Sequence, residues 1–182
     1  GERTVYKKGR KTGPMVRLAL DKSFTNNEAY ILQVNDKGIT IKGRTPAAVF
    51  YGLMTLEQLC IGNGVSARSV QLPSLYIVDQ PRTAIRELMV DPVRHFIPFN
   101  DLKGFIVEMA RYKFNALHLH LVDDQGWRIE IKKYPELIEK ASDRVGMDDM
   151  PERICGYYTQ DQMRELVRFA SAYHVMVIPE IE

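Results

Sequence analysis

The most informative segment of this sequence is His118-Leu-His-Leu-Val-Asp-Asp-Gln-Gly-Trp-Arg128. It starts as an apolar strand that carries histidines at alternate positions, so both histidines face the same side. It then runs directly into two carboxylates, an amide, an aromatic ring and a cation. In parallel α/β proteins, ligands bind just beyond the carboxyl ends of the strands. The stretch therefore predicts a strand of a parallel sheet that ends at a functional site.

The sequence around this stretch alternates strands with helices. The predicted elements are strands at 85–91 and 114–122, a helix capped by Asn100 or Asp101, a helix opened by the capping box Thr159–Gln162, and a strand from Val175. Repeating βα units predict a parallel sheet with right-handed crossovers. Residues 139–156, rich in Asp, Met and Gly, are predicted to form a loop over the strand ends.

Polar residues follow each of the three predicted strands. They are Asp91, Arg94 and His95 after the first, Asp123, Asp124 and Gln125 after the second, and Glu180 and Glu182 at the third. Such convergence on one edge is the pattern of a TIM (β/α)8 barrel. Because a barrel needs eight strands and typically about 250 residues, we expect residues 83–182 to form only its first three βα units. The chain is accordingly predicted to be a fragment or a truncated protein.

Residues 1–82 show a different pattern, typical of a small α+β domain. Its predicted parts are a strand at 15–20, a hairpin turning at Asn35–Gly38, a helix capped by Thr45 with Pro46 first, and an edge strand at 70–78 interrupted by Pro73. We expect an antiparallel sheet covered by one helix.

Composition excludes several classes of function. The net charge is +2 over 182 residues, which gives no reason to expect a nucleic-acid partner, and the basic cluster 7–11 is short and flanked by glycines. The longest apolar run is shorter than the roughly 18 residues that span a bilayer, so no membrane partner is expected. Cys60 and Cys155 have no metal or redox spacing.

The candidate site residues each allow a structural and a functional interpretation. His118 and His120 are either a metal pair or interior histidines that hydrogen-bond carboxylates. Asp123 and Asp124 are either a solvated loop pair or part of a site. Trp127, the single tryptophan, is a packing anchor or a platform for a sugar ring. Arg86 requires either an ion-pair partner or a ligand, since an unpaired buried charge is costly.

Several motifs in order resemble glycoside hydrolase family 20, the β-N-acetylhexosaminidases. The matching segments are 28–30, 50–56, 86–96, 112–115, 118–137, 158–159 and 178–182. The resemblance implies substrate-assisted retaining hydrolysis of terminal β-linked N-acetylglucosamine or N-acetylgalactosamine. In this mechanism the acetamido oxygen of the substrate is the nucleophile, and the enzyme supplies an adjacent Asp-Glu pair. It implies glycan substrates, no cofactor, no metal, and an exported (periplasmic or secreted) location, although no signal peptide opens the chain.

The resemblance also assigns roles to individual residues. Asp123 corresponds to an aspartate that orients a histidine, and that histidine is absent from this chain. Arg86 corresponds to the arginine that binds the 3- and 4-hydroxyls of the terminal sugar. Supporting positions are His120, Asp124, Trp127 and Glu182. Leu119 stands where the family commonly has tryptophan.

The sequence also departs from the family in one decisive respect. No Asp-Glu dipeptide occurs anywhere in it, so we expect the isolated chain to be inactive and its open barrel edges to self-associate. Two alternatives stay open: a non-catalytic carbohydrate-binding or structural remnant, and a metal-dependent barrel hydrolase that uses His118 and His120.

Overall fold

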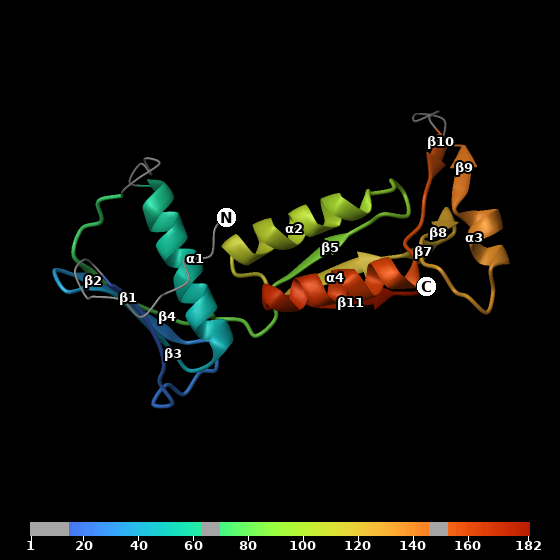
Figure 1. Cartoon of the computed structure of the whole chain (residues 1–182). Helices are drawn as coiled ribbons and strands as arrows, with labels where there is room; N and C mark the ends of the chain where they lie inside the picture. The colour runs from blue at the N-terminus through green and yellow to red at the C-terminus, as the bar shows by residue number, and fades with distance from the viewer. Residues whose placement is uncertain (1–14, 63–69, 146–152) are drawn as a thin grey trace. The chain divides into compact units, whose positions relative to one another are not determined.

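The computed structural model describes residues 15–62, 70–145 and 153–182 (Figure 1). The chain divides after Gln80 into two compact units, each with its own hydrophobic core. The basic cluster 7–11 lies outside the described residues, as does part of the predicted loop, 146–152. Within the described ranges, no helix combines the length and apolar character needed to cross a bilayer.

The first unit is a mixed β-sheet covered by a helix. Its elements are β1 (Met15–Leu20), β2 (Tyr30–Asn35), β3 (Gly38–Gly43), α1 (Pro46–Gly62) and β4 (Leu75–Asp79). The strand order is β1-β3-β2-β4, and β1 runs parallel to β3. The prediction of an antiparallel sheet is therefore wrong for β1. Residues 21–29 carry the chain from β1 past β3 to β2. β1 and β3 are therefore not joined by a hairpin, which would force them to be antiparallel.

Local signals in this unit are confirmed. Gly38 has a φ of +119° in the turn between β2 and β3, a conformation that glycine adopts without strain. The Thr45 hydroxyl accepts a hydrogen bond from the Ala48 amide at 3.2 Å, and α1 begins at Pro46. The edge strand β4 begins only after Pro73, because proline cannot donate to a sheet ladder.

The second unit contains the predicted parallel sheet, with the order β11-β6-β5. Its main elements are β5 (Glu87–Val90), α2 (Phe99–Arg111), β6 (Ala116–His120), α4 (Gln160–Ala172) and β11 (Met176–Glu180). Strands adjacent in the sheet are also consecutive in the βα repeat. Side chains of α2 and α4 share one core with Leu117 and Leu119 of β6, so both helices cover the same face of the sheet. The opposite face carries His118 and His120.

The sequence predicted the start of α4 correctly but misplaced the start of α2. The capping box is confirmed, because Thr159 Oγ1 accepts from the Gln162 amide at 3.1 Å and the Thr159 amide donates to Gln162 Oε1 at 2.8 Å. The predicted cap at Asn100 or Asp101 is wrong, since α2 already includes both residues, begins at Phe99 and has no side-chain cap. Extended Pro98 (φ −54°, ψ 143°) opens the helix instead, and its carbonyl accepts from the Asp101 amide at 2.9 Å.

The predicted loop at 139–156 is wrong where it is described. The segment after β6 forms two pairs of short strands and one short helix. They are β7 (Val122–Asp123) with β8 (Gly126–Trp127), α3 (Glu136–Ala141), and β9 (Asp143–Val145) with β10 (Arg153–Cys155). β9 and β10 pair antiparallel, and Arg153 Nε donates to Asp143 Oδ1 at 2.6 Å. The side chain of buried Arg128 donates to the carbonyls of Ser142, just before β9, and Gly156, just after β10. These bonds hold the start and the end of the β9–β10 pair.

Candidate functional site

Asp123 lies just beyond the carboxyl end of β6, where two side chains and one backbone amide meet its carboxylate. Oδ2 accepts from His120 Nε2 at 2.7 Å and forms an ion pair with Arg94, whose nearest guanidinium nitrogen lies 2.6 Å away. Oδ1 accepts from the Asp124 amide at 2.7 Å. A carboxylate offers about four lone-pair positions, and these three contacts leave one of them, on Oδ1. Asp123 is thus an oriented acceptor that can take one further donor.

His120 is held between two carboxylates. Its ring is only 6% exposed, Nε2 contacts Asp123, and Nδ1 contacts Glu180 Oε2 at 2.5 Å. The hydrogen bond to Glu180 raises the pKa of His120 above its ordinary value of 6.5, against the opposing effect of burial. The bond from His120 in turn holds the pKa of Asp123 at about 2 and lowers the pKa of Glu180. The arrangement favours an imidazolium ion between two ionised carboxylates.

Glu180 joins this group to the rest of the sheet face. Its Oε2 also lies 2.9 Å from His118 Nε2, while His118 Nδ1 lies 3.0 Å from Glu87 Oε1. Sequence reasoning placed Glu180 at a strand end but did not select it as a site residue. The alternation of β11, together with its parallel register that pairs Glu180 with His120, is the signal that could have identified it.

The cited pKa shifts define a pH dependence of stability. His120 has a raised pKa, so its contribution is complete below about pH 6.5 and is lost as pH rises through the raised value. Asp123 and Glu180 have lowered pKa values, so their contributions are complete above ordinary values of 3.8 and 4.5 and are lost at lower pH. We expect the difference in free energy of unfolding between wild type and His120→Gln, measured in urea, to be largest between about pH 4.5 and pH 6.5. A difference that grows steadily up to pH 8 would contradict this assignment.

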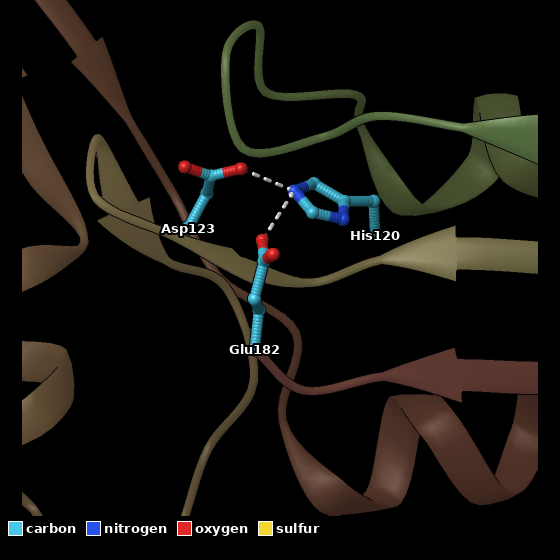
Figure 2. Close-up of side chains that lie close together, drawn as sticks. All are labelled: His120, Asp123 and Glu182. Atoms are coloured by element: carbon cyan, nitrogen blue, oxygen red, sulfur yellow. Dashed lines mark hydrogen bonds and ion pairs between the residues drawn. The ribbon is translucent and has the colours of Figure 1, made fainter.

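The donor atoms of His120, Asp123 and Glu182 lie within 4.8 Å of one another, close enough to be considered for a metal ion (Figure 2). Glu182 is the looser member, at 3.9 Å from His120 Nε2 and 66% exposed. A metal ligand must present an unprotonated nitrogen, so a cation at this position would compete with the hydrogen bond between His120 Nε2 and Asp123 Oδ2. In this structure the three side chains form a cluster of hydrogen bonds and ion pairs. His118, the other half of the predicted metal pair, contacts Glu87 and Glu180 instead.

The structure does not bring Arg86 to this cluster. Arg86 precedes β5 at the amino end of the sheet, where its Nε donates to the Lys113 carbonyl at 2.7 Å and a terminal nitrogen donates to the Thr83 carbonyl at 2.9 Å. Asp123 lies beyond the opposite, carboxyl end of the neighbouring strand. The two residues selected from the resemblance are therefore separated by the length of the sheet.

The remaining predicted positions divide between the surface and the core. Asp124 is exposed. Trp127 donates from Nε1 to the Ile129 carbonyl at 2.6 Å and packs against the core, which matches a packing anchor. Arg128 is fully buried and donates to the carbonyls of Ser142, Gly156 and Val93 at 2.7, 2.9 and 2.9 Å.

Comparisons with known proteins agree with this architecture. The sequence model of "Glycosyl hydrolase family 20, domain 2" matches residues 1–80, and that of "Glycosyl hydrolase family 20, catalytic domain" matches residues 84–182. The class is therefore that of the glycoside hydrolases. The chain belongs to glycosyl hydrolase family 20, the family of β-N-acetylhexosaminidases.

Individual relatives show the same likeness over nearly the whole chain. A β-hexosaminidase of Porphyromonas gingivalis is 39% identical over 94% of this chain and 22% of its own length. A β-hexosaminidase of Akkermansia muciniphila is 43% identical over 85% of this chain and 31% of its own. The structure of Streptomyces plicatus N-acetyl-β-hexosaminidase in complex with Thio-NAglucal matches with a TM-score of 0.81 and 40% identity, covering 92% of this chain and 34% of that one. The chain thus spans between about a fifth and a third of these relatives.

Proposed function

We propose that this chain contributes the small α+β domain and the first three βα units of a (β/α)8 barrel to a β-N-acetylhexosaminidase. The strand order β11-β6-β5 supports this assignment, because consecutive strands are neighbours and both helices cover one face. A doubly wound sheet would carry helices on both faces. The substrates of the whole enzyme are glycans with terminal β-linked N-acetylhexosamine, hydrolysed with the substrate's own acetamido group as the nucleophile.

The oriented carboxylate of Asp123 is the observation that carries this proposal. It is ionised, fixed by His120 and Arg94, and keeps one acceptor position on Oδ1. In the proposed enzyme, that position receives the N–H of a histidine that contacts the general acid. Orienting an imidazole and fixing its tautomer is a role that carboxylates have in other hydrolases.

The other predicted residues take supporting roles. His120 positions Asp123, Glu182 adds negative charge near the same ring, and Trp127 anchors the loop that carries Asp124. The assignment of Arg86 to the sugar's 3- and 4-hydroxyls requires its guanidinium to exchange the carbonyls of Thr83 and Lys113 for those hydroxyls.

The 182-residue chain by itself is expected not to hydrolyse an aryl β-N-acetylglucosaminide. The reason is chemical: its sequence has no Asp-Glu pair, and losing a general acid alone costs about 10²- to 10⁴-fold in rate. The assay is release of the aryl alcohol by purified chain. Turnover that copurifies with the chain and is lost on Asp123→Asn substitution would contradict this expectation.

A chimera tests the function of the same residues within a whole barrel. Residues 1–182 of this chain would be joined to the remaining sequence of the Akkermansia muciniphila relative. We expect the chimera to hydrolyse the substrate, and Asp123→Asn to lower kcat by about 10²-fold or more. The matched control is Asp101→Asn, exposed in the first turn of α2, which should leave kcat unchanged. A folded but inactive chimera would favour the non-catalytic remnant.

We also propose that the isolated chain self-associates through the edges of its parallel sheet. β5 and β11 are both edge strands within the described residues, and an open edge presents unpaired backbone groups. Met89 and Met176 on these strands are 54% and 57% exposed. We expect the mass measured by sedimentation equilibrium to rise from micromolar to near-millimolar concentration. A constant monomer mass over that range would rule the association out.

A further inference from the structure

We propose that Glu180 is a positioning residue that fixes Asp123 through the ring of His120. The inference rests on the proposed function for the meaning of Asp123, but its geometry stands on three side chains from neighbouring strands. Glu180 contacts His120 Nδ1 at 2.5 Å, and His120 Nε2 contacts Asp123 at 2.7 Å. Glu180 thus reaches Asp123 through a single rigid imidazole.

The ring geometry explains why Glu180 controls the orientation of Asp123. A neutral imidazole has one N–H and one lone pair, so it can donate to only one of two flanking carboxylates. Donation to both requires the imidazolium form, with one proton directed at each acid. Glu180 supplies the negative charge that keeps the second proton on the ring. Without it, the ring is more readily a neutral imidazole, and its hydrogen bond to Asp123 Oδ2 then loses the assistance of the positive charge.

The surroundings of Glu180 make this role specific. Its Oε2 is shared between His118 Nε2 and His120 Nδ1, which anchors the carboxylate on both sides. The parallel register places Glu180 directly opposite His120 on the adjacent strand. Glu182, two residues further on, lies 3.9 Å from the same ring and is mostly exposed. Glu182 can act on His120 through its charge only. Comparing variants at 180 and 182 therefore distinguishes the effect of a hydrogen bond from that of a nearby charge.

The test uses the full 182-residue chain and the pKa values of His120 and Asp123, measured by NMR of labelled side chains. Glu180→Gln is expected to lower the pKa of His120 and to raise the pKa of Asp123 by roughly one unit or more, although residue 180 does not contact Asp123. Glu182→Gln is the matched control and should move both values by less. If Glu180→Gln does not fold, Glu180→Asp keeps the charge on a shorter arm, and the same two pKa shifts are expected in reduced size.

A double-mutant cycle then shows whether Glu180 acts through His120. In a His120→Gln background, Glu180→Gln should leave the pKa of Asp123 unchanged. An unchanged Asp123 pKa in the single Glu180→Gln variant would overturn the proposal, as would an equal shift with and without His120. Because no step of this experiment measures hydrolysis, its failure would leave the proposed glycosidase function standing.

Discussion

Arg128→Met is expected to destabilise the second unit by about 3 kcal/mol or more. The Arg128 side chain is fully buried, and its fork reaches carbonyls in three separate segments, at Val93, Ser142 and Gly156. Ser142 O also accepts from the Gly156 amide at 3.0 Å, but Val93 O and Gly156 O would lose this donor. A buried carbonyl left unpaired costs about 1–3 kcal/mol, and the removed desolvation cost of the guanidinium offsets only part of that.

Urea unfolding followed by the fluorescence of Trp127 measures this effect, since Trp127 is the single tryptophan and adjoins Arg128. Arg164→Met on α4 is the control, because Arg164 is 59% exposed and forms a surface pair with Asp161, worth about 0–1 kcal/mol. Arg128→Lys keeps the charge but not the planar fork and should fall between the two. Equal unfolding midpoints for Arg128→Met and Arg164→Met would show that the three carbonyl bonds do not stabilise the unit.

Gly156→Ala is expected to cost about 2–4 kcal/mol. Gly156 has a φ of +138°, a backbone conformation that residues other than glycine rarely adopt. An added Cβ would also lie 2.4 Å from an edge carbon of the Phe96 ring. That ring packs against Tyr158 in the core, with centroids 5.1 Å apart, so it has little freedom to move away.

Gly104→Ala on α2 is the matched control, with an effect of opposite sign. Its added Cβ would meet nothing within 4 Å, and alanine in a helix interior is favoured over glycine by about 0.5–1 kcal/mol. Both variants are followed by Trp127 fluorescence in urea. Gly156→Ala as stable as wild type would show that residues 153–156 can shift away from Phe96. The Arg128 and Gly156 effects should not add, because the Gly156 carbonyl is one of the three acceptors.

Sequence predicted those features whose signals lie within a few residues of one another. The turn at Gly38, the caps at Thr45 and Thr159 and the three parallel strands all follow from local spacing. The cap of α2 was misplaced because a proline carbonyl took over from the expected side chains at 100 and 101. The strand pair β9–β10 was missed because it depends on contacts from a distant residue. Buried Arg128 hydrogen-bonds the carbonyls at both ends of the pair, 14 and 28 residues further along the chain.

For the site, residue types in a fixed order were enough to identify the family and to select Asp123 as a candidate site residue. Three-dimensional contacts were needed to show that Arg86 lies at the far end of the sheet, that buried Arg128 hydrogen-bonds distant carbonyls, and that Glu180 rather than Glu182 hydrogen-bonds His120. Such contacts join residues as many as 60 positions apart. The contact between Glu180 and His120 depends on the register between β6 and β11, which is fixed when the apolar faces of the two strands pack together against the helices.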